Sequence, residues 1–221
     1  QNLINRIPVE WGYLTNLVTV NLAANDIEDP PLEVRRIGVQ HMLRYLRQVH
    51  DSLATNKLWL QDLNLENVGG VLKRNFNVTE VHLDRNKIRS FSPLIGKCNR
   101  LQVLSLEGND LTYLPSELGE CTTLRELRVD SWKLISPPQD ILSEDIQFVL
   151  KYLRNFAAAK LSGKLDLTGS LHREIPPEIV NMTSLTWLSL KENIIVDLPP
   201  SITSLVNLSH LNLAGNKFPT V

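Results

Sequence analysis

The chain has 221 residues, of which 43% are hydrophobic and 21% charged, and its formal net charge is −1. This length is enough for one sizeable domain or one elongated array of repeats. The 23 basic and 24 acidic residues leave no excess of positive charge for nucleic acid or an anionic membrane, so we expect neither as a partner. No apolar run approaches the roughly 18 residues that a transmembrane helix needs.

Several features bear on the cellular compartment. The chain begins with Gln1 and ends partway through a repeat, so we take it as a fragment of a longer protein, and a missing targeting sequence then means little. Cys98 and Cys121 occupy the same repeat position, and we expect buried thiols rather than a disulfide. Three glycosylation sequons, about as many as chance produces, begin at Asn77, Asn181 and Asn207. We therefore expect a cytoplasmic protein.

One pattern recurs along the chain, and its clearest copy runs from Leu101 to Leu124. It reads L-x-x-L-x-L-x-x-N-x-L-x-x-L-P-x-x-L-x-x-C-x-x-L. Full copies begin at positions 78, 101, 162 and 185, and each returns after 23 residues. Short, extended or partial copies begin at positions 17, 60, 124 and 208, which makes eight expected strand segments. The L-x-L core has the period of a β-strand whose leucines point inward.

An asparagine at the ninth place of the pattern predicts a ladder of buried amides that bond to backbone groups in the turns. The asparagines at this place are Asn25, Asn86, Asn109, Asn193 and Asn216. In the other units this place is taken by Val68, Trp132 and Ser170, and we expect irregular curvature there. We also expect Trp132 to belong to the core. No unit can bury its apolar face alone, so stability must come from stacking on neighbours.

On these residues, nearly the whole chain resembles a leucine-rich repeat domain. The 23-residue unit with Leu-Pro-x-x-Leu-x-x-Leu is similar to the intracellular subclass found in Ras-pathway scaffolds, polarity scaffolds and Roco-like proteins. The resemblance implies an α/β fold, a right-handed solenoid with a concave parallel β-sheet and short helices and turns on the convex side. It also implies protein binding, and we expect residues 1–221 to form a single domain.

Two insertions interrupt the array and are similar to each other. Residues 30–49 and 137–156 align without a gap at an offset of 107. Each opens with a pair of prolines and continues with apolar residues at helical spacing, so we expect extended outer helices in the repeats at 30–57 and 137–161. Their basic residues either face water or dock an acidic partner or adjoining domain. We expect residues 50–57 to form a flexible loop.

Motifs for catalysis and metal binding are missing from the sequence. It contains no P-loop, no G-x-S-x-G elbow and no H-E-x-x-H motif. The five histidines fall in different repeats, which a solenoid separates by about 5 Å per layer. We therefore predict no catalytic residue, no cofactor, no metal and no enzymatic activity.

The candidate binding residues are the outward-facing positions of the strands, which form two columns along the expected concave face. We also place Asp62 and Asn64 in these columns. An exposed tryptophan such as Trp187 suits a binding hot spot, but it could equally lie flat on the sheet, and the charged residues could simply pair across strands. The predicted partner-binding residues are Glu80, His82, Arg125, Glu126, Arg128, Lys164, Trp187 and His210.

The sequence thus favours a protein–protein interaction module, a scaffold or recognition surface for signalling within a larger intracellular protein. Rigid strands would present a surface that loses little conformational entropy on binding. Two alternatives remain open. The segment could be the regulatory repeat domain of a Roco-type GTPase or kinase, or a structural element of a cytoskeletal or ciliary assembly. In each case, adjoining domains of the same polypeptide are further expected partners.

Overall fold

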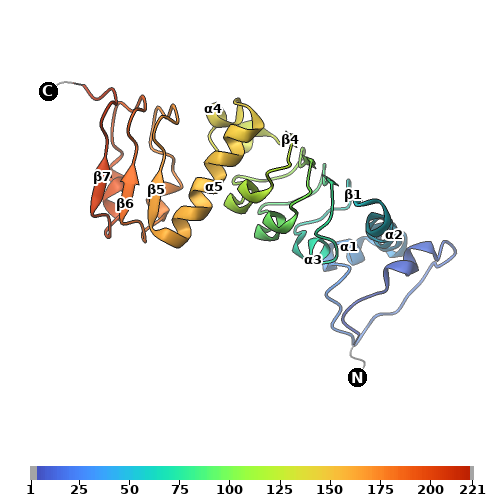
Figure 1. Cartoon of the computed structure of the whole chain (residues 1–221). Helices are drawn as coiled ribbons and strands as arrows, with labels where there is room; N and C mark the ends of the chain where they lie inside the picture. The colour runs from blue at the N-terminus through green and yellow to red at the C-terminus, as the bar shows by residue number, and fades with distance from the viewer. Residues whose placement is uncertain (1–3, 220–221) are drawn as a thin grey trace.

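The computed structural model describes residues 4–219, which form an elongated array of stacked layers with the two termini at opposite ends (Figure 1). Most layers contribute one three-residue strand and return through a 3₁₀ helix or a turn. Neighbouring strands are parallel and pair in chain order, because each layer repeats the path of the one before it. The stacked layers confirm the expected α/β leucine-repeat architecture.

Within the described residues, seven strands form two separate parallel sheets rather than one. The first sheet contains β1 (Lys57–Trp59), β2 (Glu80–His82), β3 (Val103–Ser105) and β4 (Glu126–Arg128). The second contains β5 (Lys164–Asp166), β6 (Trp187–Ser189) and β7 (His210–Asn212). The expected strand near Val20 is not formed.

Five α-helices and six 3₁₀ helices make up the rest of the regular structure in residues 4–219. The α-helices are α1 (Leu32–Ile37), α2 (Val39–Thr55), α3 (Gly69–Leu72), α4 (Gln139–Leu142) and α5 (Ile146–Ser162). The 3₁₀ helices are η1 (Val9–Tyr13), η2 (Pro93–Lys97), η3 (Ser116–Glu120), η4 (Ser131–Lys133), η5 (Ile179–Asn181) and η6 (Pro200–Ser204).

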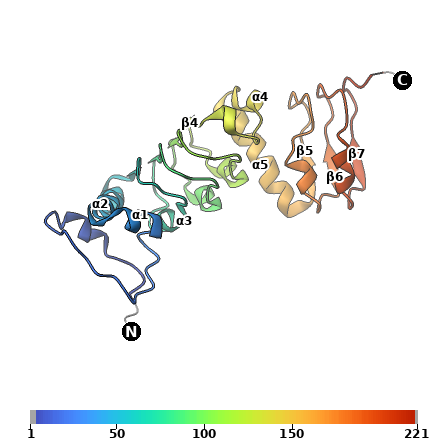
Figure 2. The same ribbon diagram turned by 180° about the vertical axis from the view of Figure 1, so that it is seen from behind.

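The long helices α2 and α5 separate layers of the array. In both ribbon views α5 crosses between β4 and β5 (Figures 1 and 2). It packs on the preceding 3₁₀ helix η3 and on the following strand β5. In the same way, α2 packs on η1, which precedes it, and on β1, which follows it. Because each helix lies beside the first strand of the next layer, pairing with the previous layer is interrupted. The insertions are helical, as expected, and the second of them, through α5, also divides the strands into two sheets.

The ends of the two long helices differ from the sequence-based expectation in one respect. Residues 50–55, expected to lie in a loop, complete α2, which leads into β1 through Asn56 alone. Asn56 has a left-handed backbone with φ of 57°, and Gly163 has φ of 68° at the same place after α5. Asparagine and glycine are the residues that tolerate this conformation at a helix end.

The offset of 107 residues extends well beyond the aligned insertions. Arg47 Nε donates to Gly12 O at 2.9 Å, and Arg154 Nε donates to Gly119 O at 3.1 Å, 107 residues further on. A Cβ atom at Gly12 would lie 2.3 Å from the Arg47 backbone nitrogen, and one at Gly119 would lie 2.4 Å from that of Arg154. Glycine is therefore required where each long helix meets the 3₁₀ helix behind it. The chain consists of two tandem blocks of one design.

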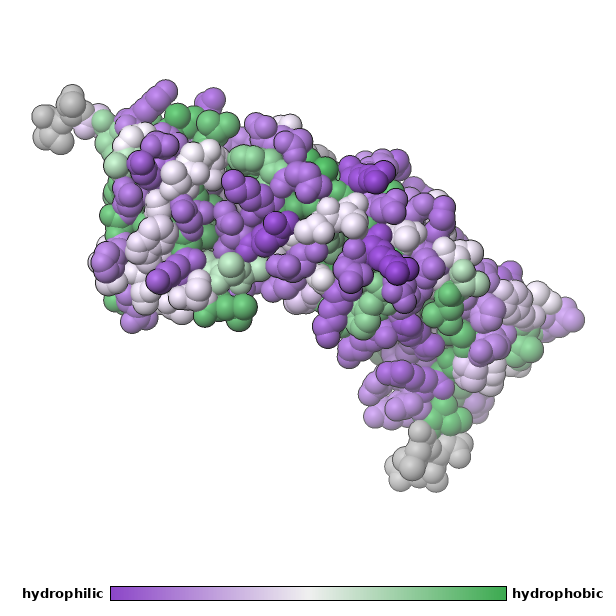
Figure 3. All heavy atoms as spheres, viewed as in Figure 1, coloured by the Kyte–Doolittle hydropathy of each residue, from purple (hydrophilic) through white to green (hydrophobic). Residues whose placement is uncertain are grey.

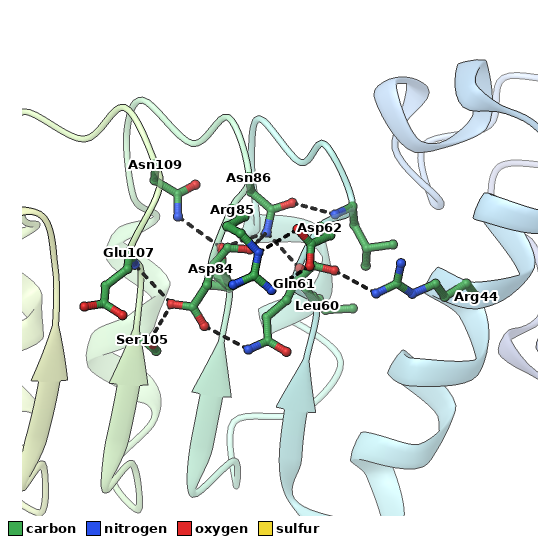
Figure 4. A network of polar contacts seen from close by, with 12 residues as sticks. Arg44, Leu60, Gln61, Asp62, Asp84, Arg85, Asn86, Ser105, Glu107 and Asn109 are labelled. Atoms are coloured by element: carbon green, nitrogen blue, oxygen red, sulfur yellow. Dashed lines mark hydrogen bonds and ion pairs between the residues drawn. The ribbon is translucent and has the colours of Figure 1, made fainter.

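The predicted asparagine ladder is formed in the layers of the two sheets, and Figure 4 shows part of it. Asn25 does not join it, because its Nδ2 donates within its own turn to Leu22 O and Ala23 O, and its buried Oδ1 has no hydrogen-bond partner among the described residues. Asn86 Nδ2 donates to Leu60 O at 2.8 Å and to Leu83 O at 2.7 Å, and its Oδ1 accepts from Leu63 N at 3.1 Å. The same pattern of two donations and at least one acceptance recurs at Asn109, Asn193 and Asn216. The ladder places that lack asparagine are Leu63, Trp132 and Ser170. Val68, predicted at this place, lies five residues beyond it, because the register of β1 aligns Leu63 with Asn86.

Two core expectations have opposite outcomes. Cys98 and Cys121 are fully buried free thiols, as predicted, and burial raises the pKa of Cys98 to about 11 and that of Cys121 to about 12. Trp132, expected in the core, is 75% exposed in η4, with Lys133 Nζ 5.2 Å from the centre of its ring. An indole is larger than the amide that fills this place elsewhere, and the local 3₁₀ turn leaves the ring outside.

A candidate protein-binding surface on the strands

The outward side chains of β1–β4 form one surface, which we call the strand face. Its two columns are Lys57, Glu80, Val103 and Glu126, and Trp59, His82, Ser105 and Arg128. Between the columns, the inward residues Leu58, Val81 and Leu104 are at most 2% exposed. The alternation of strand side chains therefore anchors this surface to the core.

The register of β1 corrects the sequence-based columns. Lys57 pairs with Glu80 and Trp59 pairs with His82, so Asp62 and Asn64 lie beyond the strand. The sequence-based unit was placed at Leu60, but Leu58 occupies the position of Val81 in β1. The sequence does contain a signal for the correct register, because Lys57 lies 23 residues, one repeat, before Glu80.

Trp59 is the residue that this shift concealed. Its ring stacks on His82 with centroids 3.9 Å apart and planes 6° apart. The tryptophan is 43% exposed, whereas the histidine beneath it is only 7% exposed. His82, predicted as a binding residue, therefore supports the tryptophan, and Trp59 presents the free aromatic face.

Glu80 links β1 and β2 through an ion pair. Its Oε1 lies 2.8 Å from Lys57 Nζ, and its Oε2 lies 3.5 Å from His82 Nε2. The hydrogen bond from Lys57 is the main cause that holds the pKa of Glu80 below its usual value. The carboxylate thus stays ionised and fixes the position of its neighbours.

A buried carboxylate anchors the end of the strand face near the turns (Figure 4). Asp84 accepts hydrogen bonds from Ser105 Oγ, from Gln61 Nε2 at 2.9 Å and from Glu107 N at 3.1 Å. Burial pushes the pKa of Asp84 up, but these hydrogen bonds outweigh it and hold the pKa below its usual value. Because its partners are all within the chain, Asp84 has a structural role and ties three layers together.

At the β4 edge, the predicted residues pair along the strand rather than across it. Arg128 Nε donates to Glu126 Oε1 at 2.7 Å, and about half of each side chain remains exposed. Arg125 precedes the strand and is exposed. An ion pair this open to solvent contributes little stability, so the charges remain available to a partner.

The remaining predicted residues lie on the second sheet. Lys164, Trp187 and His210 are in register on β5, β6 and β7. Trp187 is only partly exposed, while Lys164 and His210 on either side are exposed. Because α5 separates the sheets, the eight predicted residues form two groups rather than one continuous surface.

The described residues offer no arrangement for metal binding and no helix that could cross a membrane. Among residues 4–219, no group of three or more His, Cys, Asp or Glu side chains is arranged to hold a metal ion. The helices described there are also too short or too polar to cross a bilayer. Seen from the side of Figure 1, apolar side chains appear in small groups among polar ones (Figure 3).

The family comparison agrees with this geometry. Residues 100–121 match the family model described as Leucine Rich Repeat, and this segment includes β3 and η3. The other layers repeat the matched pattern in sequence and in strand pairing. The family match and the repeated layers together support a leucine-rich repeat domain.

Solved structures of other repeat proteins also align with the chain. A leucine-rich repeat protein of Leptospira interrogans is 27% identical, with a TM-score of 0.39, over 100% of this chain and 48% of that one. An internalin of Listeria monocytogenes is 20% identical, with a TM-score of 0.36, over 78% of this chain and 45% of that one. The ectodomain of an Arabidopsis thaliana receptor kinase is 19% identical, with a TM-score of 0.30, over 73% of this chain and 70% of that one. The chain thus spans about half the length of the first two.

Proposed function

We propose that this domain is a protein–protein interaction module whose partner binds the strand face of β1–β4. Leucine-rich repeat domains generally serve as such modules, and stacked repeats provide extended binding surfaces. The observation that carries the proposal is Trp59, which is 43% exposed although His82 holds its ring from below. A pre-ordered aromatic ring buries a large area on binding at little entropic cost.

The charges around Trp59 support a partner with a mixed, polar surface. Lys57 and Glu80 flank it on one side, and Glu126 and Arg128 lie at the far edge of the sheet. Charges of both signs at fixed positions select a complementary partner and orient it during encounter. Trp132 follows β4 directly and offers a second exposed aromatic ring at that edge.

The test compares strand-face variants with matched variants elsewhere on the molecule. Immobilised wild type, Trp59→Ala and Glu126→Lys are incubated with a cell extract, and captured proteins are quantified by mass spectrometry. Glu120→Lys makes the same charge change at the end of η3, and Val206→Ala removes an apolar side chain that is 78% exposed after η6. We expect a partner that both strand-face variants lose and both controls retain. Equal capture by all five proteins would refute the proposed surface.

A second-sheet variant tests the remaining predicted residues. Trp187→Ala removes the ring between Lys164 and His210 on the sheet beyond α5. If the partner spans both sheets, this variant binds more weakly than wild type. If capture is unchanged, the interaction is confined to the first sheet, and Lys164, Trp187 and His210 are not partner-binding residues.

We also propose that the domain works in the cytoplasm. The buried free thiols of Cys98 and Cys121, in adjacent layers, support a reducing compartment. Fractionation with glycosidase treatment tests this, since glycans on any of the three sequons would contradict it. The Roco-type and cytoskeletal alternatives stay predictions, and a P-loop in flanking sequence would favour the former.

A further inference from the structure

A cavity of about 570 Å³ lies between α5 and the turns of the neighbouring layers, away from the strand face. Phe91, Phe156 and Met182 contribute apolar walls. Ser136, Tyr152 and Glu178 contribute a polar group to the same lining. The volume falls within the range of about 300–1,000 Å³ that is typical of ligand pockets.

The Glu178 carboxylate is only half satisfied. Its Oε1 accepts hydrogen bonds from Tyr152 Oη at 2.5 Å and from Ser136 Oγ. Burial raises the pKa of the Tyr152 phenol far above its usual value, so the phenol remains a donor. Within the described residues, the buried Oε2 has no hydrogen-bond partner. A buried carboxylate oxygen without a partner is costly, which indicates a place for a cationic donor.

The first block of the chain holds a related phenol–carboxylate pair with a cation present. At an offset of 107, Asp29 corresponds to Ser136, Tyr45 to Tyr152, and Arg74 to Asn181. Tyr45 Oη donates to Asp29 Oδ1 at 3.0 Å, and Arg74 Nε donates to Asp29 Oδ2 at 2.6 Å. The first block therefore holds a complete set of phenol, carboxylate and guanidinium. The second block keeps the phenol, but Ser136 replaces the carboxylate of Asp29 and an exposed Asn181 replaces the arginine. Glu178, at the position of Val71, supplies a carboxylate to the phenol instead.

Two other cations line the cavity without filling this place. Lys160 Nζ is 2.7 Å from Ser116 Oγ and 3.4 Å from Glu117 Oε1, so it is engaged on the η3 side. Arg89 is exposed, and among residues 4–219 no ion pair joins either cation to Glu178.

We propose that this cavity binds an arginine side chain of a partner polypeptide, whose guanidinium ion-pairs with Glu178 as Arg74 does with Asp29. The last torsion of a glutamate side chain is broad, so a turn of the carboxyl group brings Oε2 to the guanidinium. Bidentate pairing with a carboxylate suits guanidinium better than ammonium. The apolar walls accommodate the arginine stem, and the remaining volume accepts neighbouring residues of the segment.

The test uses N-acetyl-arginine methylamide as the probe, with the uncharged citrulline analogue as its control. Binding is followed by NMR titration of the wild-type chain, for which we expect a Kd on the order of 1 mM. Glu178→Gln should weaken binding at least about tenfold, because the charged acceptor is lost. Asn181→Arg restores the arginine of the first block, so it should fill the cavity, raise the Tm and abolish binding of the probe.

Circular dichroism and Tm measurements establish that each variant is folded. The proposal is overturned if wild type does not bind the arginine probe, or if the citrulline analogue binds equally well. It is also overturned if folded Glu178→Gln binds as wild type does, or if Asn181→Arg leaves binding unchanged. None of these outcomes depends on the strand face, so a failure here is distinguishable from a failure of the proposed function.

Discussion

Acidification should destabilise the chain through one buried histidine. His172 is 2% exposed and lies 5.6 Å, ring to ring, from Tyr152. Its Nε2 is buried without a hydrogen-bond partner in the described part of the chain. Burial lowers the pKa of His172 to about 4 and outweighs the charge of Asp140, which raises it. In the first block, Leu65 occupies the corresponding position, so an imidazole is not required there.

The sign follows from the direction of the shift. The pKa is lower in the folded chain than in the unfolded chain, where it is about 6.5, so the unfolded state binds a proton first. The free energy of unfolding therefore falls as pH drops below 6.5, and this loss levels off below pH 4. The pKa difference corresponds to a loss of about 3 kcal/mol at the acidic limit and about 2 kcal/mol at pH 5.

The assay is urea unfolding at pH 7.5 and pH 5 for wild type and His172→Leu. Other groups titrate in both proteins, so the informative quantity is the difference between their free energies of unfolding. We expect this difference to shift by about 2 kcal/mol in favour of the leucine variant at pH 5. Val206→Ala, at an exposed side chain without an ionisable group, is the control and should leave the pH dependence unchanged. A difference for His172→Leu that is the same at both pH values would refute the reasoning.

Three further predictions concern what holds the layers together, each measured as the free energy of unfolding. Asp84→Ala leaves three hydrogen-bond donors without their acceptor and should cost about 2–3 kcal/mol, whereas Arg85→Ala breaks only an exposed ion pair and should cost much less. Asn109→Ala removes the donor to Leu106 O, the acceptor of Ile88 N and one of the two donors to Leu83 O, and should cost about 2–4 kcal/mol; a neutral result would contradict the role of the ladder. Gly119→Ala places a Cβ atom 2.4 Å from a backbone nitrogen of α5 and should cost about 3 kcal/mol, whereas Gly70→Ala meets no atom within 4 Å and should be nearly neutral.

The layered architecture was predictable because each layer repeats the same chemistry. The 23-residue period predicts parallel strands, and Asn86 and Asn193 bond as their place in the pattern requires. The register failed only at β1, where Leu63 occupies the asparagine place and extra leucines allow a second alignment. That slip of register concealed Trp59, the most exposed aromatic side chain of the strand face.

The positions of the long helices were not predictable from periodicity. Apolar spacing indicates which face of a helix is buried but not which layer it packs against. Gly12 and Gly119 mark the contacts in the sequence, but their meaning depends on the approach of Arg47 and Arg154 in the folded chain. The cavity at Glu178 likewise depends on segments that are more than 40 residues apart in the sequence.

The most direct test of the central claim is hydroxyl-radical footprinting of the complex with a captured partner, read by mass spectrometry. The method reports the solvent access of individual side chains, and tryptophan is among the most readily oxidised. We predict that the oxidation of Trp59 falls sharply when the partner binds, while that of Val206 is unchanged. Protection of Val206 with full oxidation of Trp59 would place the partner on the turns and contradict the account.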